Sequence, residues 1–162
     1  MTRPTDPERA RQIAERERNQ LAQADPSLRQ WKDAVAGTPV LVRTMSGVPS
    51  YWLVPIGQPS DAQRADQPVV GFVRVTFTGR VAAAGSFGGR ARVITGITEA
   101  EARAAASDAA PRAVIESVVF VHDGPPGREG WRVRVTGADD AGRTLFITAG
   151  GVTEPTGGGE YG

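Results

Sequence analysis

The chain has no cysteine, and His122 and Lys32 are the only histidine and the only lysine among its 162 residues. The missing cysteines exclude disulfides, thiolate nucleophiles and zinc-thiolate sites. With one histidine, a metal site would consist mostly of carboxylates, and no group of Asp and Glu has the spacing of a calcium-binding loop. We therefore expect no metal, no cofactor and no catalytic residues.

Charge of one sign and long apolar runs are also scarce. The net charge is +1 and aromatic residues make up 6% of the chain, so no bulk field gathers nucleic acid or an anionic membrane. The charged start of the chain predicts no signal peptide, no membrane span and a cytoplasmic location. Six arginines in or near expected strands offer an RNA-binding face, but few aromatics match them, which argues against nucleic acid. They are Arg74, Arg80, Arg90, Arg92, Arg132 and Arg134.

Two helix starts can be recognised. Asp6-Pro7-Glu8 combines a capping carboxylate, a proline at the first helical position and a second acid near the helix dipole. This helix has a thin apolar stripe, so we expect the start of the chain to be loosely attached. Thr98 and Glu101 form a capping box, and an alanine-rich helix follows it as far as Pro111.

The remaining regular segments are typical of antiparallel strands. Trp131, Val133 and Val135 alternate with two arginines, the pattern of a half-buried sheet. Strands are predicted at 39–45, 50–56, 69–78, 81–84, 113–121, 131–136 and 143–148. The polar segments 57–68 and 122–130 are predicted loops, and the glycine-rich segment 85–92 is interpreted as a linker because it lacks the ending of a P-loop.

The strand segments are repeated in order. The segment 50–56 matches 117–123 in pattern, and Gly71-Phe72 matches Gly130-Trp131. Val73-Arg-Val-Thr76 then recurs literally as Val133-Arg-Val-Thr136, and a Gly-Arg pair follows each copy. With a capped helix before each set, this order predicts a duplicated unit.

The second copy resembles a PepSY domain, the module of protease propeptides and of sporulation and membrane-sensor proteins. The resemblance covers 97–154 and is carried by Ile97-Thr-Glu-Ala-Glu-Ala-Arg-Ala-Ala-Ala and by the hairpin that begins at Gly130-Trp131. It implies a helix packed on a curled antiparallel sheet that inhibits or chaperones a partner. A cystatin-like helix-on-sheet fold gives the same pattern.

The expected fold is therefore α+β, with two tandem units that each pack a helix on a curled antiparallel β-meander. We expect a charged N-terminal helix over 1–25, a first unit over 26–89, a second PepSY-like unit over 90–154 and a flexible tail over 155–162.

The function expected from these patterns is a non-catalytic protein-binding module, which is an inhibitor, a chaperone or an accessory subunit. Its partner is another protein, such as a protease or an assembly partner, and a homo-oligomer is left open. The alternative is a small-ligand or enzymatic pocket in which Asp123 orients His122 as a general base. The candidate partner-binding residues are Tyr51, Trp52, His122, Asp123, Arg128, Glu129 and Trp131.

Overall fold

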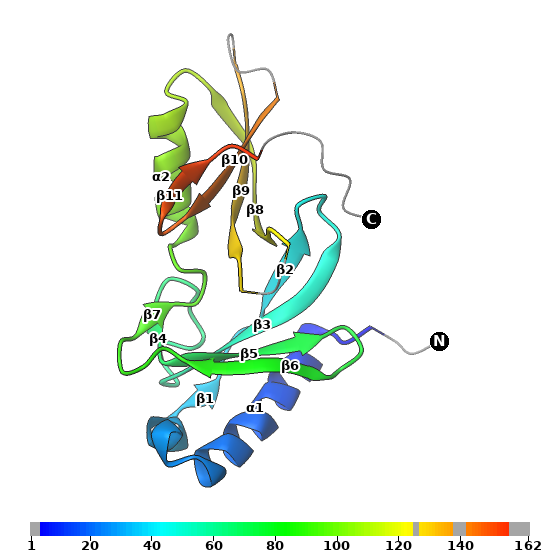
Figure 1. Ribbon diagram of the computed structural model, residues 1–162, viewed down its shortest axis with the longest axis vertical. Helices are drawn as coiled ribbons and strands as arrows, with labels where there is room; N and C mark the ends of the chain where they lie inside the picture. Colours follow the sequence, from blue (N-terminus) through cyan, green and yellow to red (C-terminus); the bar gives the residue numbers. More distant parts are fainter. Residues whose placement is uncertain (1–3, 125–126, 138–141, 156–162) are drawn as a thin grey trace. The chain divides into compact units, whose positions relative to one another are not determined.

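A computed structural model describes residues 4–124, 127–137 and 142–155 of the chain. The fold is mixed α+β with antiparallel strand pairs, in agreement with the expected class (Figure 1). Two compact units are present, formed by residues 1–43 with 48–95 and by residues 44–47 with 96–162. The main change of unit thus follows Thr95, later than the boundary after residue 89 that the sequence suggests. Of the expected tail at 155–162, residues 156–162 lie outside the described residues.

Helix α1 (Pro7–Ala24) starts where the sequence predicts, because the side chain of Asp6 accepts a hydrogen bond from the backbone of Arg9 at 2.8 Å. Contrary to the expected loose attachment, Thr5 and α1 are held on the first sheet. The backbone N–H and the hydroxyl of Thr5 both donate to the carbonyl of Phe77, at 2.9 and 3.0 Å. Ala10 and Ala14 are fully buried in the core of the first unit. The narrow apolar stripe of α1 is enough to attach the helix, because the small alanine side chains let it approach the sheet closely.

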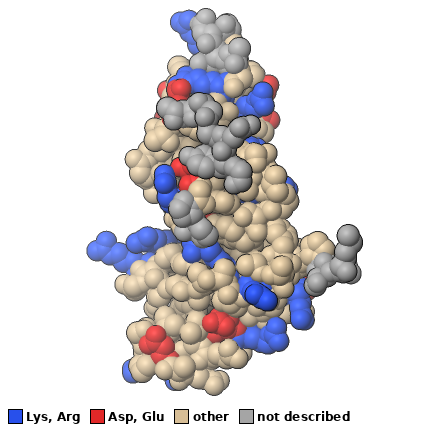
Figure 2. Space-filling view, turned by 45° about the vertical axis from the view of Figure 1, so that its right-hand side comes forward, with Lys and Arg blue, Asp and Glu red and all other residues tan. Residues whose placement is uncertain are grey.

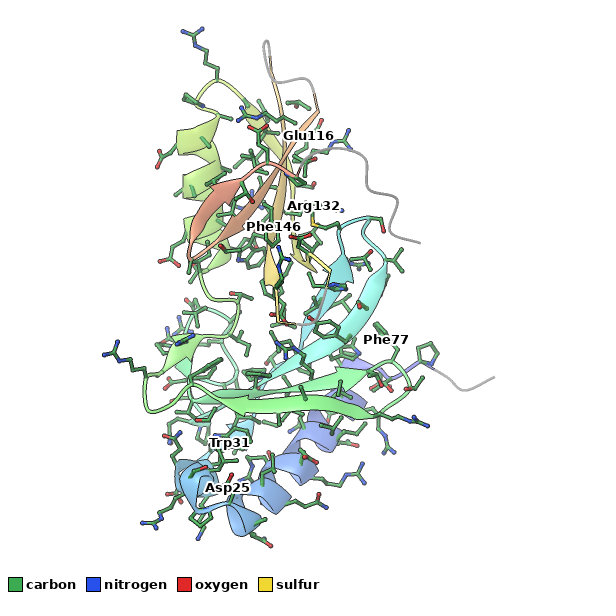
Figure 3. The ribbon with its side chains drawn as sticks, viewed as in Figure 1. Asp25, Trp31, Phe77, Glu116, Arg132 and Phe146 are labelled. Atoms are coloured by element: carbon green, nitrogen blue, oxygen red, sulfur yellow. The ribbon has the colours of Figure 1, made fainter. Side chains whose placement is uncertain are left out.

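A 3-10 helix, η1 (Pro26–Asp33), follows α1 and carries the fully buried Trp31. In Figure 3, Trp31 lies between η1 and the sheet. The strands of the first unit are β1 (Val35–Ala36), β2 (Val40–Thr44), β3 (Pro49–Gly57), β4 (Pro68–Val69), β5 (Gly71–Thr76), β6 (Val81–Ser86) and β7 (Arg92–Val93). Strands β1 and β2 pair with β3, β3 pairs with β5 and β5 pairs with β6, while β4 and β7 form a separate pair.

One face of the first sheet is covered by α1. Val54 and Ile56 of β3 and Val73 and Val75 of β5 are fully buried against this helix and η1. Because side chains alternate along a strand, the residues between them, such as Phe72 and Arg74, lie on the opposite face. The loop 58–67 is only partly exposed, since Ala62 is buried and its carbonyl accepts from the backbone of Thr38 at 2.9 Å.

The second unit packs helix α2 (Glu99–Ala109) on a four-stranded meander. Its strands are β8 (Val114–His122), β9 (Glu129–Thr136), β10 (Arg143–Thr148) and β11 (Gly151–Thr153), paired in chain order. The predicted capping box is present: Thr98 Oγ1 accepts from the backbone of Glu101 at 3.1 Å, and Glu101 Oε2 accepts from the backbone of Thr98 at 2.7 Å. The buried side chains are small on the helix and branched on the strands. They include Ala102, Ala106, Val133, Val135, Leu145 and Ile147.

Candidate functional site: an open edge strand beside arginine and phenylalanine

The three aromatic residues predicted to bind a partner are buried or partly buried. Tyr51 is 6% exposed and Trp131 is 9% exposed. The indole N–H of Trp52 donates to the carbonyl of Thr5 at 2.8 Å, and that of Trp131 donates to the carbonyl of Ile97 at 3.0 Å. Each acceptor directly precedes the N-cap of its unit's helix. These indoles therefore tie a helix start to a sheet, and their partner-binding role stays a prediction.

The other four predicted residues lie together where β8 meets β9. His122 is paired with Glu129 in the strand register, and its Nδ1 lies 2.6 Å from the carbonyl oxygen of Gly124. Asp123 forms an ion pair with Arg128 at 2.9 Å. A carboxylate that orients His122 as a base would contact a ring nitrogen, whereas Asp123 contacts Arg128 and Nδ1 faces a carbonyl. This geometry stabilises a turn, and part of that turn, 125–126, lies outside the described residues.

A shallow pocket of about 310 Å³ lies on α1, away from the predicted residues. Its lining consists of Arg9, Arg11, Gln12, Glu15 and Arg16. Arg11 is paired with Glu8 at 2.6 Å, and Glu15 is paired with the buried Arg18. Ion pairs within α1 thus engage Arg11 and Glu15, two of the four charged residues that line the pocket.

Glu15 and Arg18 join α1 to the segments after it. Arg18 Nη1 donates to the carbonyl of Trp31 at 2.7 Å, and Glu15 Oε2 accepts from the backbone of Ala36 at 2.7 Å. Burial alone raises the pKa of Glu15. The bonds from Arg18 and Ala36, with the charges of Arg18 and Arg11, outweigh burial and lower the pKa below its usual value. This network is a structural anchor.

Two kinds of site have no counterpart in the described part of the chain. No group of three or more Asp, Glu or His side chains there could hold a metal ion. No helix within the same residues is long and apolar enough to cross a membrane.

Strand β6 has one unpaired side. It pairs with β5, and no other described strand pairs with it. The backbone N–H of Phe87 donates to the carbonyl of Val70 at 2.9 Å. This bond determines which residue pairs of β5 and β6 are hydrogen-bonded. Since hydrogen-bonded and non-hydrogen-bonded pairs alternate in an antiparallel ladder, the backbone groups of Ala84 and Ser86 point away from β5. These two residues are exposed, so their outward N–H and C=O groups are open to an added strand.

Four side chains form a ladder on the face of the first sheet opposite α1. Arg74 Cζ lies 4.6 Å from the centre of the Phe72 ring, and Arg92 Cζ lies 5.5 Å from the centre of the Phe87 ring. The two rings lie 5.8 Å apart at an angle of 37°. Both guanidinium groups are within the range of cation–π attraction. We call Arg74, Phe72, Phe87 and Arg92 the Arg–Phe ladder.

The Arg–Phe ladder borders the open edge because β6 has glycine opposite Phe72. A Cβ placed on Gly85 would lie 2.7 Å from Cε1 of Phe72, so the ring rests directly on the backbone of β6. The segment 85–92, interpreted from sequence as a linker, instead contributes two ladder residues and parts of β6 and β7. The sequence signal for this cluster was the alternation of Phe72 and Arg74 along β5. The contact with Phe87 depends on the pairing of the strands and could not be seen in the sequence.

Comparison of the chain with models of protein families, with curated proteins and with solved structures finds no match. The PepSY-like resemblance therefore stays a prediction, and the functional argument depends on the geometry of the described residues.

Proposed function

We propose that the protein is a protein-binding module that takes up an extended segment of a partner by strand addition at β6. The observation that carries this proposal is the unpaired side of β6, where Ala84 and Ser86 direct backbone groups outward. In strand addition, main-chain hydrogen bonds supply affinity and alternate side chains supply specificity.

The composition of β6 supports the proposal. Edge strands commonly carry a charge, a proline or an inward-turned polar group that prevents pairing with another chain. The sequence of β6, Val-Ala-Ala-Ala-Gly-Ser, has none of these, and its small side chains let a second strand approach. The one irregularity of β6 in this pairing is a bulge at Ala82, the extra residue opposite the step from Arg74 to Val75, and the segment from Ala83 to Ser86 is regular.

We extend the proposal to the internal repeat. The strands of the two units are matched differently from the alignment that the sequence suggests. Helix α1 starts beside Phe77, beyond the end of β5, whereas α2 starts beside Trp131, near the start of β9. Matching β5 to β9 would therefore reverse the helix relative to the sheet.

A shift by one strand removes this reversal. We match β2, β3, β5 and β6 to β8, β9, β10 and β11, so that the pair Trp52–Val75 corresponds to Trp131–Ile147. With this match, each indole N–H donates a hydrogen bond to the residue that precedes the N-cap of the equivalent helix. Both units would be helix-on-meander modules, the kind of scaffold that the PepSY-like resemblance implies.

The test uses peptides that are N-methylated at alternate positions. A nine-residue valine–threonine peptide, labelled with fluorescein, is measured by anisotropy with the full chain. Methylation of the residues whose N–H groups face β6 should weaken binding by about tenfold or more, because each lost hydrogen bond costs about 0.5–1.5 kcal/mol. Methylation of the alternate residues, whose N–H groups point away from β6, should have little effect on binding.

A protein variant tests the same edge from the other side. Ala84→Pro removes one outward N–H and leaves the bonds to β5 in place, so it should weaken the unmethylated peptide. Ala84→Ser keeps the N–H and is the matched control. Strand addition at β6 would be excluded if methylation at either set of alternate positions weakened peptide binding equally and if the Ala84→Pro variant bound the peptide as well as the parent chain does.

A further inference from the structure

We infer that the segment bound at β6 carries an aromatic side chain at the position opposite Gly85. This inference rests on the proposed strand addition and specifies the sequence of the partner segment. Its basis is a phenylalanine ring of β5 that reaches over a glycine of the edge strand.

The ring of Phe72 reaches from β5 over β6. Gly85 is paired with Phe72 in the register, and a Cβ on Gly85 would lie 2.7 Å from Cε1 and 2.8 Å from Cζ of this ring. These two atoms belong to the end of the ring that is farthest from the backbone of β5. Because glycine has no side chain, the rim of the ring lies over the edge strand, next to the side where a further strand would pair.

The backbone geometry of an added strand brings one of its residues close to this rim. The outward groups of Ala84 and Ser86 make these two residues the hydrogen-bonded positions of an antiparallel addition. Gly85 lies between them and faces its partner residue in a non-hydrogen-bonded pair, with Cα atoms about 4.5 Å apart. Paired residues point to the same face of a sheet, so the partner side chain opposite Gly85 lies beside the rim of Phe72.

The second unit contains the same arrangement with its third strand in place. A Cβ on Gly130 of β9 would lie 2.7 Å from Cζ and 2.8 Å from Cε2 of Phe146, which belongs to β10. Strand β8 pairs with the other side of β9 and places Val121 opposite Gly130. Val121 is fully buried, so an apolar side chain occupies the position opposite this glycine. In the first unit, an added strand would supply the equivalent residue.

The charge distribution of the Phe72 ring favours an aromatic residue at this position. Arg74 lies over one face of the ring, 4.6 Å from its centre, and the ring of Phe87 lies 5.8 Å away. The rim of an aromatic ring carries partial positive charge and its faces carry partial negative charge, so a rim attracts the face of a second ring. An aromatic side chain is also large enough to reach this rim across the glycine.

Charged partners and nucleic acid match this edge less well. All six residues of β6 are uncharged. In the view of Figure 2, basic and acidic side chains of the described residues are interspersed with uncharged surface, without the continuous basic track of a nucleic-acid channel. Single-stranded nucleic acid also needs open ring faces on which its bases stack, whereas Arg74 lies over a face of Phe72 and Arg92 over a face of Phe87.

The experiment measures three fluorescein-labelled peptides by anisotropy with the full chain. Each is a nine-residue valine–threonine host with phenylalanine, cyclohexylalanine or alanine as its central residue, and a single-stranded oligouridylate is the fourth probe. The phenylalanine peptide should bind about three- to tenfold tighter than the alanine peptide, the range expected for one aromatic pair. Cyclohexylalanine has a similar size but no electron-rich face, so its peptide should bind more weakly than the phenylalanine peptide.

The aromatic residue should also determine the register of the bound peptide. With phenylalanine at the centre, N-methylation of its two neighbours should weaken binding, because their N–H groups face β6. Moving phenylalanine by one residue along the host should move the sensitive positions by one residue as well. Sensitive positions that stay in place would contradict an aromatic contact at Gly85.

Matched variants locate this contact. Phe72→Leu removes the rim and should abolish the preference for phenylalanine over alanine. Phe77→Leu is the control, because the ring of Phe77 lies beside Trp52 instead, with centres 6.0 Å apart, and it should leave the preference unchanged. Gly85→Ala keeps every backbone N–H and places a Cβ against the ring of Phe72, so it should also reduce the preference. This variant provides the comparison if Phe72→Leu folds poorly.

The outcomes separate this inference from the proposed function. Equal binding of the phenylalanine and alanine peptides, with both still weakened by N-methylation at one set of alternate positions, would refute the aromatic preference and leave strand addition in place. Cyclohexylalanine binding as tightly as phenylalanine would likewise refute a preference for an aromatic ring. Peptides insensitive to methylation at either set of positions would refute strand addition itself. Tighter binding of oligouridylate than of the phenylalanine peptide, lost in Phe72→Leu, would assign this edge to nucleic acid.

Discussion

At the scale of single residues, Gly71 determines how closely η1 approaches the sheet. A Cβ at this position would lie 2.5 Å from Cζ2 of Trp31 and 2.6 Å from the carbonyl oxygen of Gly85. The second contact is with backbone, which cannot rotate away. We expect Gly71→Ala to lower the free energy of unfolding by about 1–3 kcal/mol, the range for an overpacked core. Urea denaturation followed by tryptophan fluorescence measures this change.

Gly150→Ala is the control for that substitution. A Cβ there would meet only the hydroxyl of Thr148, at 3.4 Å, which is an ordinary contact. Its effect on stability should be small. A Gly71→Ala protein as stable as the parent chain would mean that Trp31 does not pack tightly against β5.

At the scale of elements, the sequence predicts the pieces whose signals are local. The N-cap at Asp6 and the capping box at Thr98 involve residues within one helical turn, and both are confirmed. Strand β10 has the predicted bounds, and the other main strands differ at their ends. Alternation and turn residues suffice for such elements because their environment is set by near neighbours.

Elements that depend on distant partners could not be predicted in this way. Strands β1, β4 and β7 have two residues each, too few for an alternation pattern, and exist because a remote strand pairs with them. The Arg–Phe ladder has the same origin, since Phe72 and Phe87 meet through the register of β5 and β6. The hydrogen bonds of the Trp52 and Trp131 indoles likewise depend on where each helix starts. The sequence does not reveal these bonds, and for this reason both rings were predicted to contact a partner.

The attachment of α1 should depend on pH through Glu15. Its pKa is lowered from the usual 4.5, because bonds from Arg18 and Ala36 outweigh the effect of burial. A lowered pKa in the folded chain stabilises folding fully above about pH 4.5, and this contribution is lost as the pH falls through the lowered value. Glu15→Gln should therefore reduce stability at neutral pH and flatten its decline in acid. Denaturation curves across this pH range test the prediction.

Glu17→Gln is the matched control, because it removes the same charge from the same helix without touching this network. Glu8, Asp25 and Glu101 also have lowered pKa values, through their bonds to Arg11, Ser27 and Thr98 respectively. Their contributions are present in both variants and cancel in the comparison. Parallel pH curves for Glu15→Gln and the parent chain would contradict the anchoring role.

At the scale of the whole molecule, the two units use one device to fix a helix on a meander. The indole of Trp52 bonds to the residue before the α1 cap, and that of Trp131 bonds to the residue before the α2 cap. The remaining tryptophan, Trp31, is buried under the first sheet and does not take part. If the units are copies matched with the one-strand shift, equivalent substitutions should have equivalent effects.

Replacement of either indole by phenylalanine removes the hydrogen bond and keeps an aromatic ring in place. We expect Trp52→Phe and Trp131→Phe each to lower the free energy of unfolding by about 1–2 kcal/mol, from the lost bond and the smaller ring. The bonds share no partner, so the double variant should show the sum within about 0.5 kcal/mol. Chemical denaturation followed by far-ultraviolet circular dichroism measures all three variants. A large loss for one tryptophan and none for the other would show that the two indoles are not equivalent, and would remove the main structural support for the shifted repeat.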